Sequence, residues 1–264
     1  MECRLITCGT LIKKITAADT LFGGVYCIDP YQNCDFGCLY CDSSIDKTIY
    51  VKTNASTILQ KELKQVEKGV IIIGSVRDPY QKAEEKYGIT KNLLKTIKKY
   101  HFPCHILTKS TLVLRNVNLL SDMRCVITMS IVSLDKNIAR IFEENAPLPK
   151  ERMQTVKTLI QHSIKTGIAL MPVLPFLAES NLQDVVKTAS RCNAQHLLHK
   201  HLELKGDHRS VFMDTIKNNY PHLLSKYEGL YKGGILPDRK YIAKFDNKMH
   251  ELCKKYNLSE RILL

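Results

Sequence analysis

Short apolar runs alternate with amphipathic segments along most of the chain. Six runs rich in β-branched and other apolar residues predict strands at 24–28, 69–75, 104–110, 125–131, 167–174 and 195–204. Between them, apolar residues recur at helical spacing and predict helices at 55–68, 89–100, 112–122, 149–165 and 181–192. Such runs are typical of strands buried on both faces of a parallel sheet with helical crossovers. The pattern therefore predicts an α/β fold of six strand and helix units.

The extent of the repeat limits the architecture. A closed barrel of eight units typically needs about 250 residues, whereas the six predicted strands fit within 24–204. We therefore expect a partial (β/α)6 barrel in a domain at 1–204, with an open sheet as the alternative. Helical patterns at 209–227 and 238–256 predict additional C-terminal helices, an extension at 205–264 packed on the barrel. Chemistry in such folds gathers at the C-terminal edge of the sheet.

The charge of the chain is strongly positive, because 39 Lys and Arg stand against 26 Asp and Glu, a net charge of +13 over 264 residues. A basic surface attracts polyanions, so nucleic acid is a candidate partner. An acidic reductant of the ferredoxin or flavodoxin type would be attracted by the same charge. No apolar run approaches the roughly 20 residues of a membrane helix, and the first residues lack a signal-peptide pattern. We expect a cytoplasmic protein without a membrane partner.

Three of the ten cysteines, Cys34, Cys38 and Cys41, lie within eight residues of a polar loop at 31–44 that follows the first predicted strand. In a reducing compartment such a group indicates metal or redox chemistry. Iron–sulfur clusters normally take four thiolates, so three of them leave one iron open. Structural zinc would need a fourth ligand, normally in a second cysteine pair that does not follow here. A four-iron cluster is favoured over structural zinc and over inert cysteines.

The spacing C-x3-C-x2-C, with Tyr40 directly before the third cysteine, resembles the signature of the radical S-adenosylmethionine superfamily. The resemblance implies a 4Fe-4S cluster whose open iron binds S-adenosyl-L-methionine. It also implies an enzyme that cleaves this cofactor reductively to methionine and a 5'-deoxyadenosyl radical, which then abstracts hydrogen from a substrate. By the same resemblance, Tyr40 would lie against the adenine.

A longer stretch, 25–215, is similar to the spore photoproduct lyase and DNA repair photolyase-like branch of that superfamily. The similarity rests on "IIIGSVRDPYQKAEEKYGITKNLLKTI", "ILTKS", "ITMSI", "IFEENAPLPKERM" and "TGIALMPVLPFL". It implies that Lys109 and Ser130 hold the carboxylate and ribose side of the cofactor. Gly74 and Ser75 occupy the strand end where the superfamily usually has a glycine-rich, acid-ending motif. Taken alone, Lys109 also fits a solvated lysine and Ser130 a satisfied core hydroxyl.

Two positions depart from the lyases. Ser75 stands where those enzymes carry a cysteine that returns hydrogen, and Asp42 stands where they carry a tyrosine. A serine O–H bond is too strong for the serine to replace a thiol as hydrogen donor. The sequence therefore argues against repair of the spore photoproduct. Nucleic acid, a protein or peptide, and a small molecule remain candidate substrates, and a non-enzymatic module that binds metal or nucleic acid is a further alternative.

Other polar residues have two interpretations each. Arg152 matches an arginine of that branch, and pairing with a carboxylate such as Glu143 is its alternative role. Asp78 either borders the substrate or caps the turn that follows it. His199 and His201 share one face of a predicted strand, where ordinary polar side chains are favoured over metal ligands.

Overall fold

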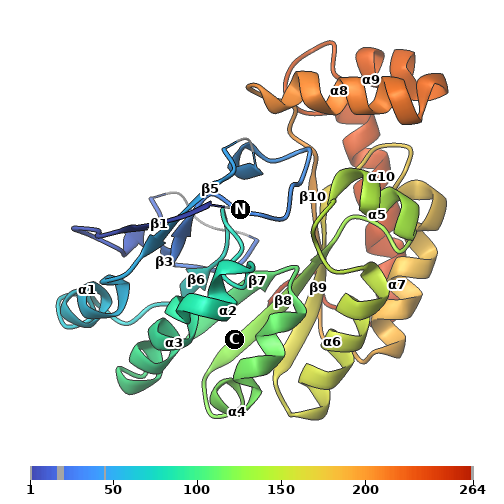
Figure 1. The fold of residues 1–264 in the computed structure, drawn as a ribbon. Coiled ribbons are helices and arrows are strands. Elements are labelled where there is room, and N and C mark those ends of the chain that lie inside the picture. Colours follow the sequence, from blue (N-terminus) through green and yellow to red (C-terminus); the bar gives the residue numbers. More distant parts are fainter. Residues whose placement is uncertain (1, 17–20, 45, 263–264) are drawn as a thin grey trace.

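The computed structural model describes residues 2–16, 21–44 and 46–262, which form one curved main sheet covered by helices (Figure 1). The strand order of this sheet is β10-β9-β8-β7-β6-β3-β2. Every neighbouring pair from β3 to β10 is parallel, and only the short β2 runs antiparallel to β3. The bounds are β2 (Lys13–Lys14), β3 (Tyr26–Ile28), β6 (Ile71–Ile73), β7 (Cys104–Thr108), β8 (Cys125–Ile131), β9 (Lys165–Val173) and β10 (Leu197–His201). Six parallel strands in chain order confirm the predicted partial barrel.

The crossover helices lie outside the curved sheet, as right-handed connections require (Figure 1). They are α1 (Ala55–Glu62), α2 (Ala83–Tyr87), α3 (Ile89–Lys99), α4 (Val117–Leu120), α5 (Lys136–Phe142), α6 (Pro149–Gln161) and α7 (Leu182–Arg191). The helix expected at 112–122 is instead a 3-10 helix, η2 (Thr111–Asn116), followed by the single turn of α4. The hydroxyl of Ser110 caps η2 by accepting a hydrogen bond from the Leu112 N–H.

The interior of the barrel contains both packed apolar side chains and a buried series of hydrogen-bonded polar side chains. Every residue of β8 is buried, as expected of a central parallel strand. Phe22 stacks on His105, with ring centroids 5.0 Å apart. The Thr128 hydroxyl oxygen lies 2.7 Å from His105 Nε2 and 2.8 Å from His196 Nε2. These three polar side chains therefore form a hydrogen-bonded chain inside the barrel, although the buried Nδ1 of His105 has no partner among the described residues.

A second, three-stranded sheet was not expected from the sequence. Its order is β1-β5-β4, with β1 (Glu2–Ile6) parallel to β5 (Thr48–Lys52) and β4 (Tyr31–Gln32) antiparallel to β5. Strand β4 opens the cysteine-containing loop and β5 follows it. Both ends of that loop are therefore held by strand pairing.

The C-terminal part folds into α8 (His208–Asn219), η4 (Pro221–Leu223), α9 (Leu224–Leu230) and α10 (Arg239–Lys255). Phe245 and Met249 of α10 are buried in the same apolar cluster as the barrel strands. Phe212 of α8 packs in a second cluster that includes Phe142 of α5. Within the described ranges, no helix combines the length and apolar character needed to cross a membrane.

Candidate active site

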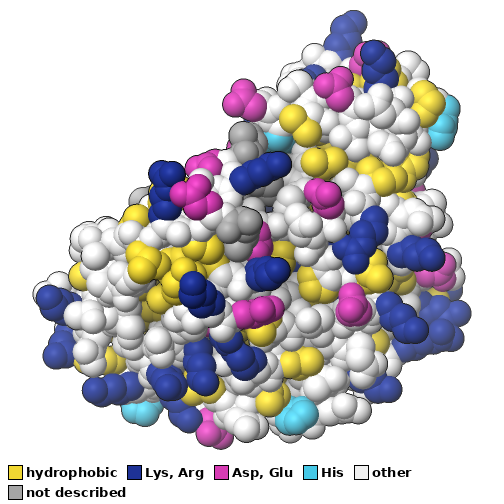
Figure 2. Space-filling view, viewed as in Figure 1, with side chains coloured by type: hydrophobic (Ala, Val, Ile, Leu, Met, Phe, Trp, Pro, Cys, Tyr) yellow, Lys and Arg dark blue, Asp and Glu magenta, His cyan; other side chains and the backbone are white. Residues whose placement is uncertain are grey.

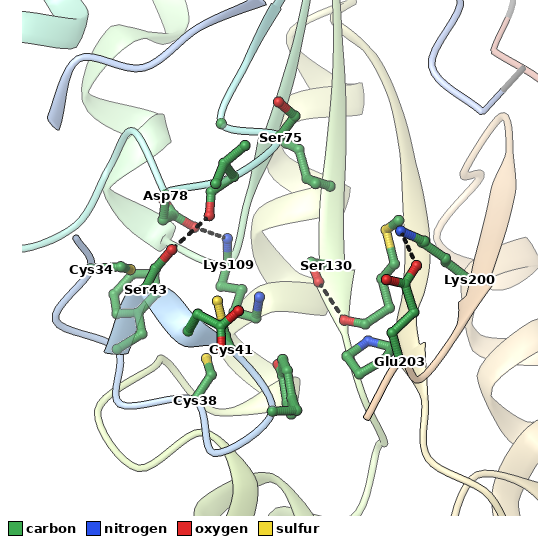
Figure 3. Close-up of a pocket in the computed structure, with 18 of the residues that line it drawn as sticks. Cys34, Cys38, Cys41, Ser43, Ser75, Asp78, Lys109, Ser130, Lys200 and Glu203 are labelled. Carbon is green, nitrogen blue, oxygen red and sulfur yellow. Dashed lines mark hydrogen bonds and ion pairs between the residues drawn. The ribbon is translucent and has the colours of Figure 1, made fainter. Parts of the chain in front are cut away.

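A cavity of about 340 Å³ opens at the C-terminal ends of the parallel strands. The cysteine loop forms one side of it and the residues after β10 form the opposite side, with the ends of β7 and β8 between them (Figure 3). The eight residues that the sequence assigned to the cluster or to the cofactor all line this cavity: Cys34, Cys38, Cys41, Tyr40, Gly74, Ser75, Lys109 and Ser130.

The cysteine loop is held by backbone hydrogen bonds. The N–H of Cys34 donates to the Ser43 carbonyl at 2.9 Å, and the N–H of Cys41 donates to the Cys38 carbonyl at 3.1 Å. The ten cysteines, all within the described ranges, form no disulfide. Burial raises the pKa of Cys38 to about 12, while the nearby Lys109 ammonium opposes the rise. Such thiols ionise only beside a positive partner, and a bound metal is one.

The end of β6 requires a glycine. Gly74 has a φ of +89°, and a Cβ added there would lie 2.3 Å from the Leu107 carbonyl oxygen of β7. The glycine therefore allows the chain to turn against the neighbouring strand. The next residue, Ser75, is exposed at the cavity.

Asp78 caps the turn that follows it, which is one of the two roles considered for it, and it also lines the cavity. Its carboxylate accepts hydrogen bonds from the Tyr80 N–H at 2.9 Å, the Thr108 hydroxyl at 2.7 Å and the Lys109 N–H at 2.6 Å. The first bond caps the turn, and the other two hold the end of β7. Burial raises the pKa of Asp78, and these hydrogen bonds oppose the rise. Asp78 therefore fixes the backbone from which Lys109 projects into the cavity.

Beneath the cavity, the carboxylate of Glu143 contacts side chains from three other parts of the chain. Its Oε2 lies 2.6 Å from Arg152 Nη2, so the expected pairing with Arg152 is confirmed. Its Oε1 accepts a hydrogen bond from the Tyr40 hydroxyl and lies 3.9 Å from Lys109 Nζ. The Lys109 ammonium is 5.8 Å from the centre of the Tyr40 ring. Lys109 and Tyr40, which come from distant segments of the chain, therefore both contact the buried carboxylate of Glu143.

Ser130 is tied into the sheet. Its hydroxyl donates to the Met171 carbonyl at 3.1 Å, and its own carbonyl accepts a hydrogen bond from Arg152 Nη1 at 3.0 Å. The hydroxyl proton is therefore used within the core, as the simpler interpretation expected. The oxygen keeps a lone pair for a further donor in the cavity.

The side of the cavity after β10 carries charged residues whose role the sequence did not reveal. Glu203 pairs with Lys200 at 2.8 Å and with Lys205 at 3.3 Å. Across the cavity, Asp42 Oδ1 lies 2.5 Å from Nδ1 of His208, at the start of α8. The dense run of histidine and lysine at 196–208 was the only sequence signal for this side.

The family of the chain follows from comparison with known proteins. A model of the Radical SAM superfamily matches residues 28–189, more than half of the chain. The chain belongs to the radical SAM superfamily. It is therefore an enzyme of the group that uses a 4Fe-4S cluster and S-adenosylmethionine.

The chain is also similar to other proteins in sequence and in fold. A protein of Mycobacterium tuberculosis is 26% identical over 96% of this chain and 81% of its own length. A protein of Methanocaldococcus jannaschii is 29% identical over 63% of this chain and 67% of its own. Spore photoproduct lyase complexed with dinucleoside spore photoproduct superposes with a TM-score of 0.76 at 16% identity, covering 96% of this chain and 79% of the lyase. Streptococcus suis SuiB bound to S-adenosylmethionine gives 0.62 at 14%, covering 88% and 48%. At these identities the two structures show a shared fold.

Proposed function

We propose that the three cysteines of the 31–44 loop hold the cluster and that the cavity holds S-adenosylmethionine beside it. When bound, the pair would supply a 5'-deoxyadenosyl radical that abstracts hydrogen from a substrate. The observation that carries the proposal is that three thiols and a lysine from separate segments line one cavity. The residues proposed to contact the cofactor are Tyr40, Gly74, Ser75, Lys109 and Ser130.

The chain's own side chains suit that cofactor. The Lys109 ammonium is a point charge for a carboxylate, and its side chain is 18% exposed, so it reaches the cavity. The Ser130 oxygen would accept a hydrogen bond from a ribose hydroxyl while its own O–H continues to donate to the Met171 carbonyl. With its hydroxyl on Glu143, Tyr40 presents a fixed ring to a purine.

The test is anaerobic reconstitution with iron and sulfide, followed by S-adenosylmethionine and a strong reductant. The protein should turn brown, hold close to four irons per chain and release 5'-deoxyadenosine. Cys34→Ala should abolish all three properties. Cys27→Ala is the matched control, because Cys27 does not line the cavity and its replacement should change none of them. A colourless protein that keeps stoichiometric zinc at the loop would overturn the proposal.

For the substrate, we propose nucleic acid, and the net charge of +13 supports this class. Lysine and arginine side chains are spread over the face of the molecule seen in Figure 2. Lys200 lies on the side of the cavity opposite the thiols (Figure 3), and Lys205 also lines the cavity, so that two lysines surround the single carboxylate of Glu203. The lyase with the similar fold binds a dinucleoside. Deuterium from a labelled nucleic acid should appear in 5'-deoxyadenosine.

The ten cysteines without a disulfide support a reducing, cytoplasmic setting, and the basic surface would suit a ferredoxin- or flavodoxin-type reductant.

A protein or peptide is the second candidate substrate, because the fold also resembles SuiB bound to the precursor peptide SuiA, with a TM-score of 0.53. Binding of DNA and RNA no better than by an unrelated protein of similar charge, with hydrogen passing from a peptide instead, would favour this candidate.

Repair of the spore photoproduct itself is not proposed. Apart from the three loop cysteines, no cysteine is among the described residues that line the cavity. Ser75 and Asp42 occupy the positions of the hydrogen-returning pair, and Asp42 is engaged by His208. A dinucleoside spore photoproduct supplied to the reconstituted enzyme should therefore not be converted to thymines.

A further inference from the structure

Two histidines and a carboxylate converge behind the wall of the cavity, where β10 ends. His199 and His201 lie two residues apart on β10, where alternate side chains share a face, and both rings reach the same side despite a register shift between them. Their Nε2 atoms lie 2.9 Å and 2.7 Å from a single oxygen, Oδ1 of Asp246 on α10. One ligand atom from each of the three residues lies within 4.8 Å of the others.

The surroundings suit an ion better than they suit a simple ion pair. Asp246 has no Lys or Arg partner among the described residues, although the chain is rich in both. The ring of Phe245 lies 5.8 Å and 5.4 Å from the two histidine rings, and Tyr241 lies 6.2 Å from His201. These aromatic rings pack beside the two imidazoles and hold their orientation. The carboxylate side chain is 44% exposed, which leaves a path for an ion and room for water ligands.

We propose that His199, His201 and Asp246 bind one divalent transition-metal ion, with zinc as the best match. Two imidazoles and a carboxylate form the three-ligand set of open zinc sites, in which water takes the fourth position. Nitrogen ligands disfavour calcium and magnesium, which take oxygen. The two nitrogen–oxygen distances, 2.9 Å and 2.7 Å, need to lengthen only by about half an ångström, to about 3.3 Å, for the atoms to bind an ion at about 2.0 Å.

The ion would join two parts of the structure. His199 and His201 belong to the last strand of the sheet, while Asp246 belongs to a C-terminal helix. His201 also lines the cavity. The ion would therefore hold α10 against the strand that forms this side of the cavity, at a place separate from the cysteine loop.

The experiment uses the full chain after anaerobic reconstitution with iron and sulfide, so that the loop cysteines are occupied. It is equilibrated with Zn²⁺, passed through a desalting column and analysed for metal, and Co²⁺ serves as a spectroscopic probe. We expect one zinc per chain in addition to iron, and a visible Co²⁺ band without the thiolate charge-transfer band of a cysteine site. Asp246→Asn should weaken zinc binding by about 10- to 100-fold or more.

Asp214→Asn is the matched control, because Asp214 is an exposed aspartate on α8 and should keep the zinc. If circular dichroism shows that Asp246→Asn is not folded, His199→Gln replaces it, and the same loss of zinc binding is expected. A triple Cys34→Ala, Cys38→Ala, Cys41→Ala variant should still bind one zinc. Equal zinc content in Asp246→Asn and wild type, no zinc beyond trace in wild type, or loss of zinc in the triple variant would each overturn the proposal.

Discussion

Replacing Arg152 with methionine should destabilise the protein far more than breaking an equally short ion pair on the surface. Arg152 Nη2 lies 2.6 Å from Glu143 Oε2, and the two side chains are 1% and 0% exposed. Arg4 Nε lies 2.8 Å from Glu2 Oε1, with both side chains 60% exposed. The two pairs have similar lengths, so the comparison sets a buried ion pair against an exposed one.

The magnitude follows from what Arg152→Met leaves behind. Glu143 would remain buried without its closest cation, and loss of one partner from a buried pair typically costs about 3–5 kcal/mol. Lys109, with its Nζ 3.9 Å from Glu143, offsets part of that cost. Two hydrogen bonds from Arg152, to the Pro147 and Ser130 carbonyls, are lost as well. Arg4→Met, by contrast, should cost about 0–1 kcal/mol.

The assay is urea unfolding of iron-free, reduced protein followed by far-UV circular dichroism. With a slope of about 3 kcal/mol/M, a loss of about 4 kcal/mol lowers the midpoint by about 1.3 M. Adding Glu143→Gln to Arg152→Met should restore part of the loss, because the unpaired charge is then gone. A midpoint for Arg152→Met within about 0.3 M of that for Arg4→Met would refute the reasoning.

Three further outcomes are expected. Lys109→Ala should cost about 1.5–3 kcal/mol of S-adenosylmethionine binding, about 10- to 150-fold in Kd by equilibrium dialysis, with iron content unchanged; wild-type affinity would make Lys109 an ordinary lysine. Burial lowers the pKa of His105 to about 3 and of His196 to about 4. The pKa of a histidine in the unfolded chain is about 6.5, so between about pH 6.5 and the lowered folded pKa only the unfolded chain takes up these protons. The free energy of unfolding should therefore decrease as the pH is lowered through this range, by about 1.4 kcal/mol per pH unit for each histidine. Urea midpoints at pH 7 and pH 5 measure this, and a His105→Gln, His196→Gln double variant should lose most of the dependence. Finally, duplex DNA affinity should fall with salt at a log–log slope of about −0.9 per phosphate contacted, and a flat response in a filter-binding titration would exclude phosphate contacts.

The main sheet was predictable because its signal is local. Each parallel strand is a short apolar run between helical patterns, and the run at 125–131 coincides with β8 (Cys125–Ile131). The second sheet was missed because its pairing is not local. Strand β1 (Glu2–Ile6) is largely exposed and pairs with β5 (Thr48–Lys52), which lies far along the chain. Neither strand carries a long enough apolar run to be recognised alone.

The site was predictable to the extent that parallel strand ends share one edge of a sheet. The resemblance to the lyase branch singled out Lys109 and Ser130, and the rule agrees with their position at strand ends on the edge that carries the cysteine loop. The partners of the loop were not predictable, because Glu143 lies beyond the end of α5 and His208 begins a C-terminal helix. Short irregular segments carry no periodicity, so their side chains are located only by folding.

The C-terminal segment does more than cover the barrel, because it completes the open side of the sheet. Strand β10 has a sheet neighbour on one side only, β9, and an uncovered edge would leave backbone groups unpaired. The carbonyl of Ser259 accepts a hydrogen bond from the Leu197 N–H at 2.8 Å, which covers part of that edge. Asp246 then engages the histidines at the end of β10, and His208 reaches across the cavity to Asp42 in the cysteine loop. The two sides of the cavity are therefore linked through the C-terminal helices, so changes in those helices should alter the cavity as directly as changes in the barrel.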